Sequence, residues 1–406
     1  MSHDLLVATR TRPKPEHVAS FAAANGAEPT TADGFRPGSN TLLTLPGGEG
    51  RTIDIDGPNR VELDDLPDDL AGVVSRANWL VEIHVPAASR PDLLGAALDL
   101  AIHLARSTDG AVFDPQADRI AWPPGVTPSV RGSNEVRIRV VELDWFVPAS
   151  AVPPEAATHW LALAERIVPS ALPVRFGGYE PFQGRVDRDG TEAFVRAWQD
   201  EATVPFGSAL SWTAAGGGLS GSVSFPDTRH ERRPARLGRV LRLTADFDAR
   251  PLHRDPARCE ALTEFFVAVA ETFGAAFAAG SVTRDTIVRR GRTWSDQRTE
   301  WPPIPRASWW VGLPALPSWL SWYGPAYRDL VAGALPVDLT ATRASGLIVR
   351  HGAEPKDIDE LQGIASPLPA DLLARRRDRA PVDPAVRIGL TSGPPSEPAE
   401  VIPWID

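Results

Sequence analysis

The stretch WLVEIHVPAASRPDLLGAALDLAIHLARSTDGAVF, residues 79–113, decides the fold. Residues 79–85 alternate apolar and polar side chains, which is typical of a half-buried strand. Ser89 followed by Pro91 marks a helix start, and apolar side chains then recur at helical spacing until Gly110 ends the helix. Residues 111–113 and 119–122 favour two further strands around a turn. The segment therefore predicts a strand–helix–strand module with an appended hairpin.

The same order of elements returns later in the chain. Residues 135–147 favour a long strand, 153–168 a helix, 239–247 a clear strand, 257–279 the longest helix and 282–290 another strand. The glycine run at 216–221 matches the G-x-G-x-x-G pattern of dinucleotide loops, but the residues after it favour a strand and not a helix. We interpret the run as a hairpin turn. The predicted class is α+β, with mixed or antiparallel sheets and two similar modules.

Composition shifts along the chain suggest the domain boundaries. Residues 123–132 are rich in proline and glycine, which separates a module at 1–130 from a second at 131–292. Residues 293–372 are dense in tryptophan and proline, and we expect them to pack on the second module. Residues 373–406 form a proline-rich tail.

Charge and cysteine content exclude several classes of protein. The formal net charge is −10, from 52 acidic and 42 basic residues, which disfavours direct nucleic-acid binding and suits a basic partner. The single cysteine, Cys259, rules out an intrachain disulfide and a zinc site built from several cysteines. No stretch of eighteen consecutive apolar residues exists, so we expect a cytoplasmic protein that does not contact membranes.

Acidic and histidine residues offer only weak catalytic patterns. The pairs Asp54/Asp56 and Asp246/Asp248 lie at strand spacing, so each pair can share one face and hold a hard cation. A turn and a strand end explain them equally well. His84 and His103 can approach each other across the first strand and helix, with Glu82 on the face of His84. We expect no catalytic residue, no metal site and no cofactor.

Residues 54–69 carry seven acidic side chains against Arg60 alone. Such a run can present carboxylates to a basic partner in place of phosphate. The alternative is a solvated helix start, where the helix dipole favours aspartate. The candidate partner-binding residues of this run are Asp64, Asp65, Asp68 and Asp69.

The most unusual feature is an aromatic cluster, because six of the thirteen tryptophans lie between residues 294 and 322. Tryptophan and tyrosine dominate the energetics of many protein interfaces. A buried aromatic core is the alternative, and the sequence leaves both open. The candidate partner-binding residues here are Trp309, Trp310, Trp319, Trp322 and Tyr323.

Three motifs of this region, WWVGLP (309–314), WLSWYG (319–324) and GLIVR (346–350), resemble bacterial polymorphic-toxin immunity proteins, namely Immunity protein 52 and related type VI families. The motifs LDWFVP (143–148) and LPVRFGGYEP (172–181) are similar to proteins of high-GC Gram-positive bacteria. The resemblance covers residues 145–373. It implies a cytosolic α+β protein that binds and neutralises a toxin, in that family a nuclease, and it transfers no catalytic residue.

Three functional hypotheses follow. The leading one is a protein-binding module that neutralises a basic toxin by direct contact. The first alternative is an enzyme with a dispersed carboxylate or histidine site, such as a metal-dependent hydrolase that uses Asp246 and Asp248. The second alternative is a structural component of a phage or secretion assembly. The sequence favours a binding protein over an enzyme and leaves the oligomeric state open.

Overall fold

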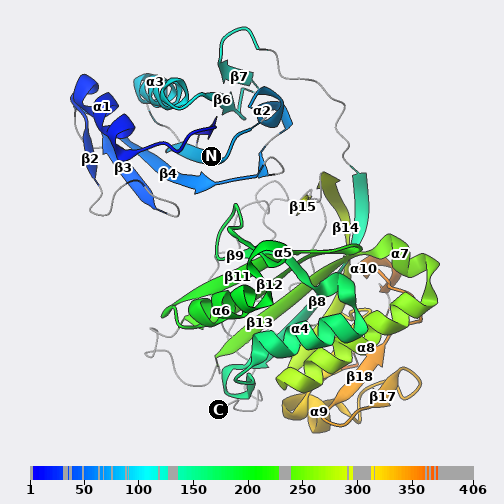
Figure 1. Ribbon diagram of the computed structural model, residues 1–406. Coiled ribbons are helices and arrows are strands. Elements are labelled where there is room, and N and C mark those ends of the chain that lie inside the picture. Colours follow the sequence, from blue (N-terminus) through cyan, green and yellow to red (C-terminus); the bar gives the residue numbers. More distant parts are fainter. Residues whose placement is uncertain are drawn as a thin grey trace, which may run out of the picture. The chain divides into compact units, whose positions relative to one another are not determined.

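The computed structural model divides the chain into two compact units, residues 1–133 and 134–406 (Figure 1). It describes residues 3–30, 35, 39–47, 50–62, 65–66, 68–74, 76–86, 89, 91–117, 119–126, 136–227, 239–289, 292–295, 312–314, 316–361, 364, 367–369 and 372–373. Each unit combines helices with one large sheet, which confirms the predicted α+β class.

The first unit is built around one sheet. Its elements are β1 (His3–Thr9), α1 (Pro15–Asn25), β2 (Glu28–Thr30), β3 (Asn40–Thr44), β4 (Thr52–Arg60), α2 (Asp68–Val73), β5 (Trp79–Val85), α3 (Pro91–Ser107), β6 (Gly110–Asp114) and β7 (Arg119–Trp122). The strand order is β2-β3-β4-β5-β1-β6-β7, with antiparallel neighbours throughout. The N-terminal strand therefore lies between β5 and β6, which α3 connects.

The second unit begins with β8 (Val136–Pro148), α4 (Ala156–Ile167), β9 (Pro173–Gly177), β10 (Gly184–Arg185), α5 (Val186–Asp189), α6 (Thr191–Ala202), β11 (Phe206–Ala214) and β12 (Gly218–Asp227). It continues with β13 (Val240–Asp248), α7 (Ala249–Arg254), α8 (Pro256–Phe273), β14 (Phe277–Arg289), β15 (Arg292–Ser295), β16 (Leu320–Tyr323), α9 (Pro325–Val331), β17 (Thr340–Thr342), β18 (Leu347–Arg350) and α10 (Ile358–Leu361). The strand order is β10-β9-β11-β12-β13-β8-β14-β16-β18-β17, and β15 pairs with β14.

The two units share one connectivity. In the first unit the chain runs through β1, α1, β2, β3, β4, β5, α3 and β6, and the strands lie in the sheet in the order β2-β3-β4-β5-β1-β6. In the second unit the chain runs through β8, α4, β9, β11, β12, β13, α8 and β14, and the strands lie in the corresponding order β9-β11-β12-β13-β8-β14. The elements β10, α5 and α6 are an insertion between two corresponding strands. The prediction of two similar modules is therefore confirmed at the level of topology.

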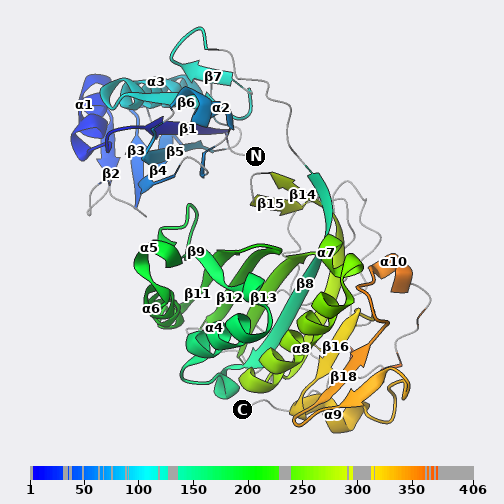
Figure 2. The same cartoon turned by 45° about the vertical axis from the view of Figure 1, so that its right-hand side comes forward.

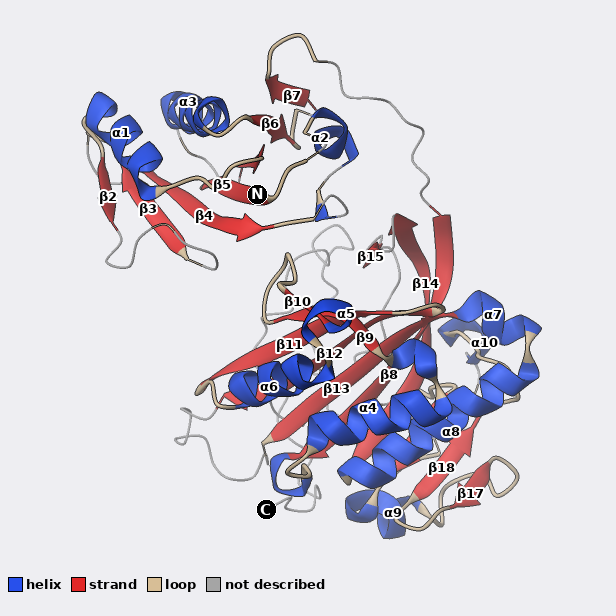
Figure 3. Ribbon diagram, in the orientation of Figure 1, coloured by secondary structure: helices blue, strands red, loops and turns tan. Residues whose placement is uncertain are grey.

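Helices cover one face of each sheet, as Figures 2 and 3 show for α1 and α3 and for α4 and α8. The alternation along β4 explains the arrangement in the first unit: Ile53 and Ile55 are fully buried in the core that includes α1 and α3. Asp54 and Asp56 therefore point to the opposite face, because successive strand side chains alternate. α2 packs on part of that opposite face through Leu70, and Leu66 and Val74, just outside the helix, pack beside it.

Aromatic rings fill the core of the second unit. The ring of Trp160 meets those of Trp145 and Trp212 edge to face, and Phe265 meets Trp145 and Trp160 in the same way. The indole Nε1 of Trp145 donates to the backbone oxygen of Phe266 at 2.9 Å, so this ring is buried without losing its hydrogen bond. Gly221 lies against Trp212, where a Cβ would stand 2.4 Å from a ring carbon. The glycine run is thus part of a hairpin, since β11 pairs with β12 across it.

Two features differ from the sequence expectation. The helix expected over 257–279 ends at Phe273, because Gly274 adopts a left-handed conformation with φ of 65°, and β14 follows from Phe277. Helix α1 was not expected, although Pro15 in its first turn and Gly26 at its C-cap are ordinary boundary signals. Among the described residues, no helix has both the length and the apolar character needed to cross a membrane.

Candidate functional site

The face of the first sheet opposite α1 and α3 carries two cross-strand rows of side chains. One row runs from Leu42 on β3 through Asp54 and His84 to Asp4 on β1. The next row runs from Asn40 through Asp56 and Glu82 to Leu6. We call these eight residues the acidic face, because they include four carboxylates. Leu42 is 41% exposed, so an apolar side chain borders the charged ones.

Polar side chains of the acidic face contact one another and Asn59. The imidazole Nδ1 of His84 lies 2.9 Å from Oδ1 of Asp4. Asp54 accepts a hydrogen bond from Asn40 at 3.1 Å, and Asp56 accepts one from Asn59 at 3.4 Å. Within the described part of the chain, no lysine or arginine forms an ion pair with Asp54 or Asp56. Their negative charge is therefore offset by no described cation of the protein.

The acidity of the chain is concentrated in this unit. Residues 1–133 contain 18 acidic and 11 basic residues, a formal net charge of −7 out of −10 for the whole chain. The other 273 residues share the remaining −3. A third of the chain thus carries most of the charge that would attract a basic molecule.

The corresponding face of the second sheet is polar and carries an arginine among its carboxyls. β8, β13 and β12 correspond to β1, β5 and β4, and they place Glu142, Asp144, Arg242, Asp246 and Ser220 on the face away from α4 and α8. Nε of Arg242 donates to Asp144 at 2.6 Å, and its Nη2 donates to Glu142 at 3.3 Å. Asp144 is almost fully buried, so this arginine satisfies a carboxylate that water does not reach.

Asp246, on this second face, is a carboxyl with a raised pKa. Burial, together with the charge of nearby Asp144, raises its pKa to about 6, against the opposing effects of the hydrogen bond from Ser220 at 2.5 Å and of the charge of Arg242. A carboxyl of this kind can exchange a proton near neutral pH. The described residues contain no group of three or more histidine, cysteine or acidic side chains with metal-binding geometry.

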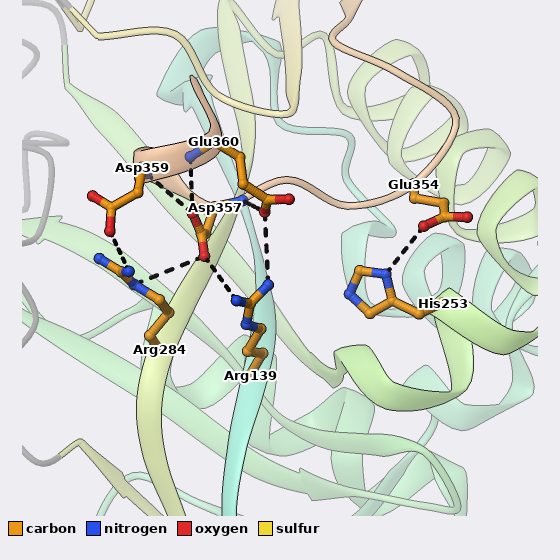
Figure 4. A network of polar contacts seen from close by, with 7 residues as sticks. All are labelled: Arg139, His253, Arg284, Glu354, Asp357, Asp359 and Glu360. Carbon is orange, nitrogen blue, oxygen red and sulfur yellow. Dashed lines mark hydrogen bonds and ion pairs between the residues drawn. The ribbon is translucent and has the colours of Figure 1, made fainter. Parts of the chain in front are cut away.

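A third polar cluster, shown in Figure 4, fastens α10 to the sheet. Oδ1 of the buried Asp357 accepts from the backbone N–H of Asp359 at 3.0 Å and of Glu360 at 3.1 Å, so it caps the helix. Its Oδ2 lies 3.3 Å from Nη2 of Arg139 on β8 and 3.8 Å from Nε of Arg284 on β14. Arg284 also pairs with Asp359. Each of these charged groups has a partner, which indicates a structural fastening.

The candidate residues of the acidic run are placed as follows. Asp65 is 6% exposed and accepts a hydrogen bond from the backbone N–H of Glu62 at 2.8 Å, so it stabilises a turn. Asp68 and Asp69 lie in the first turn of α2, where aspartate favours helix formation. Asp64 lies outside the described residues. The carboxylates that the fold does bring together on one face of the sheet are instead Asp4, Asp54, Asp56 and Glu82.

The aromatic candidates that the structure describes are buried. Trp319 and Trp322 belong to the core of the second unit, and Tyr323 packs in the cluster on the other face of the sheet. Nε1 of Trp322 donates to the backbone oxygen of Ala275 at 3.2 Å. The buried-core alternative thus applies to these three side chains, which offer no surface to a partner. Trp309 and Trp310 lie outside the described residues.

The fold brings some of the weaker catalytic candidates together and keeps others apart. Asp54 and Asp56 share a face, as their spacing predicted, and the pairing of β4 with β5 places Glu82 and His84 on the same face. His84 and His103 do not meet, because His103 on α3 lies 3.1 Å from the backbone oxygen of His17, on the side of the sheet away from His84. Asp248 ends β13 and caps α7 through the backbone N–H of Arg250. Sheet order, which spacing alone does not reveal, decides which of these residues are neighbours.

Comparison with known proteins gives little similarity. No family model matches the chain, and no curated protein matches it. A solved Pseudomonas aeruginosa T6SS protein aligns at 12% identity over 54% of this chain and 70% of that chain, with a TM-score of 0.37. DynU16, a protein of the dynemicin biosynthetic locus, aligns at 15% identity over 67% of this chain and 95% of that chain, with a TM-score of 0.14. At these values the matches carry no argument about function.

Proposed function

We propose that this chain is a cytoplasmic protein-binding module that neutralises a cognate basic toxin by direct contact. The observation that carries the proposal is the acidic face of the first unit, within a unit of net charge −7. Proteins that act on nucleic acids need a basic surface to bind phosphates. A rigid sheet presenting carboxylates competes for such a surface and blocks it.

The edges of the first sheet support binding through the face. β2 contains Pro29, which cannot donate a ladder hydrogen bond, and β7 is four residues long with an irregular register against β6. Arg119 is exposed on β7, and Pro123 follows that strand. Short strands, proline, charge and bulges all discourage the addition of another strand. The acidic face is therefore the better surface for a partner in this unit.

Electrostatic complementarity also fits the kinetics that neutralisation requires. Opposite charges raise the rate of encounter, and this gain falls as salt screens the charges. An inhibitor that has to capture a toxin soon after it appears benefits from fast association. Binding of the partner is thus expected to weaken as ionic strength rises.

The test combines capture with neutralisation. The tagged chain is used to isolate stoichiometric partners from a lysate of the source bacterium, and each partner is expressed with and without the chain in a susceptible host. We expect a basic protein that arrests growth alone and is harmless with the chain. Capture of proteins whose effect on growth the chain leaves unchanged would contradict the proposal.

A further inference from the structure

We propose that residues 351–361, which we call the strap, form a pH-responsive element of the second unit. The strap is closed over Cys259 while His351 is neutral, and it opens when His351 takes up a proton. The strap consists of the loop after β18 together with α10. It belongs to a different unit from the acidic face, so this inference does not depend on the proposed function.

The strap connects two strands of the second sheet that are not neighbours. It begins where β18 ends and reaches β14, where Asp357 forms a parallel bridge with Val282. On the way it passes Trp319: the backbone N–H of His351 donates to the oxygen of Trp319 at 2.8 Å, and Nε1 of Trp319 donates to the oxygen of Gly352 at 3.3 Å. The contacts of α10 in Figure 4 fasten the far end. The strap is therefore held at both ends.

The middle of the strap covers the single thiol of the chain. Sγ of Cys259 on α8 donates to the backbone oxygen of Ala353 at 2.9 Å, and Cys259 is 1% exposed. Nη2 of Arg350 donates to the same oxygen, while Nη1 of Arg350 lies 2.7 Å from Oε1 of Glu260. Because Ala353 is exposed and the buried thiol contacts its carbonyl oxygen, opening of the strap gives a reagent access to Cys259.

His351 is the residue of the strap that responds to pH. It is 8% exposed, and no described residue forms a hydrogen bond with its ring. Gly352 follows with φ of 104°, and Nζ of Lys356 would lie 3.2 Å from a Cβ at that glycine, so Lys356 folds back across the turn. Within the described part of the chain, no acidic side chain pairs with Lys356. Burial and the charge of Lys356 both lower the pKa of His351 below its ordinary value of 6.5.

The acidic side chains of the strap, and Glu260 beside it on α8, already have cationic partners. These pairs are Glu260 with Arg350, Glu354 with His253, Asp357 with Arg139 and Arg284, Asp359 with Arg284, and Glu360 with Arg139. The pair of His253 and Glu354 opposes the effect, because protonation of His253 strengthens it. Its side chains are 32% and 64% exposed, however, and such pairs contribute little. A proton on His351 therefore adds a second cation beside Lys356, and each of these carboxylates is already engaged.

Closure of the strap is consequently linked to pH. In the closed strap the pKa of His351 lies below 6.5, and in the open strap the ring is in water and regains its ordinary pKa. The open state thus binds the proton more tightly, so acidification shifts the equilibrium toward it. The contribution of neutral His351 to closure is fully present above about pH 6.5 and is lost as the pH falls through the lowered pKa.

The experiment measures the rate at which dipyridyl disulfide reacts with Cys259 in the full-length chain, at about pH 7.5 and about pH 5, the range in which a histidine titrates. Each rate is divided by that of glutathione at the same pH, which removes the ionisation of a free thiol from the comparison. His351→Asn removes the titrating ring, and Lys356→Gln removes the cation beside it. The matched control is His159→Asn, which removes an exposed histidine of α4. Circular dichroism at both pH values reports whether the fold is retained.

We expect the relative rate of the wild type and of the His159→Asn control to rise about threefold or more at the lower pH, with an unchanged circular dichroism spectrum. In His351→Asn the relative rate should be the same at both pH values, and in Lys356→Gln it should rise less than in the wild type. A wild-type rate that does not depend on pH, or an equal rise in His351→Asn, would overturn the inference.

Two further outcomes are decisive. Loss of the circular dichroism signal together with the rise in rate would overturn the inference, because the whole unit and not the strap would then be opening. If His351→Asn reacts fast at both pH values because its strap does not close, Lys356→Gln provides the test. A rise in Lys356→Gln equal to that of the wild type would then overturn the inference, and a smaller rise would support it.

Discussion

Asp56 and Glu82 face each other across β4 and β5 with no residue between them, on a sheet face that α1 and α3 leave open. Natural sheets usually place opposite charges or apolar side chains at such positions, because like charges cost stability there. The arrangement leads to a prediction about the isolated protein, before any partner is considered.

Asp56→Asn should stabilise the first unit by a few tenths to about 1 kcal/mol, because it removes one member of the repelling pair and keeps an oxygen for Asn59. Urea unfolding followed by circular dichroism at low salt measures the change. Added salt should raise the stability of the wild type toward that of the variant. A variant that is less stable than the wild type at low salt would show that repulsion is not the dominant effect at this position.

The stability of the second unit should depend on the ionisation of Asp246. Its folded pKa of about 6 lies above the usual value of 3.8, so the folded state holds the proton more tightly than the unfolded state. The contribution of Asp246 to stability is therefore fully present below about pH 4 and is lost as the pH rises through about 6. Asp246→Asn should flatten this part of the profile. The free energy of unfolding, measured at closely spaced pH values, tests this prediction. An unchanged slope of stability against pH in the Asp246→Asn variant would contradict it.

Two substitutions at Asp357 separate the stabilisation by the helix cap of α10 from that by the ion pairs with Arg139 and Arg284. Asp357→Asn keeps an oxygen for the helix N–H groups and loses the charge that faces Arg139 and Arg284. Asp357→Ala loses both. We expect Ala to cost about 1 kcal/mol more than Asn, which is the usual value of a helix cap. Because both arginines are partly exposed, the ion pairs should contribute little beyond that. Equal losses for the two variants would mean that capping contributes nothing.

The burial of Trp322 predicts a large loss of stability and not a specific loss of binding. Trp322→Ala should cost about 3–5 kcal/mol, because it opens a cavity in the core and leaves the backbone oxygen of Ala275 without its donor. The exposed Val337, at 91%, offers a control, since Val337→Ala should change stability by less than about 0.5 kcal/mol. Denaturant unfolding measures both. A well-folded Trp322→Ala protein would contradict the core assignment.

Much of the fold was accessible from the sequence because its strong elements have strong local patterns. The strand at 79–85, the helix after Pro91 and the strand at 240–248 all bury one regular stripe, so their periodicity is clear. Helix α1 has a weaker stripe, with Val18, Phe21 and Ala22 as its buried residues, and only its ends announce it. The end of α8 was not predicted, because it depends on the left-handed conformation of Gly274 and apolar residues continue after that glycine.

The candidate site was harder to predict, for a physical reason. A strand shows from its own residues which side chains share a face, and so Asp54 and Asp56 were paired in advance. It does not show which strand lies beside it. Asp4 joins the acidic face only because β1 inserts next to β5, some 80 residues further along the chain. The tryptophan cluster posed the opposite difficulty, since composition does not distinguish a buried aromatic layer from an exposed one.

The position of β1 and β8 has a consequence for synthesis. In each unit the strand that leaves the ribosome first takes the central place, between β5 and β6 or between β13 and β14. One of its two neighbouring strands is synthesised much later, since β6 begins at Gly110 and β14 at Phe277. During that interval an apolar strand has no permanent neighbour and is exposed to mispairing. The central pairing of each sheet therefore forms only after the intervening strands and helices have been synthesised.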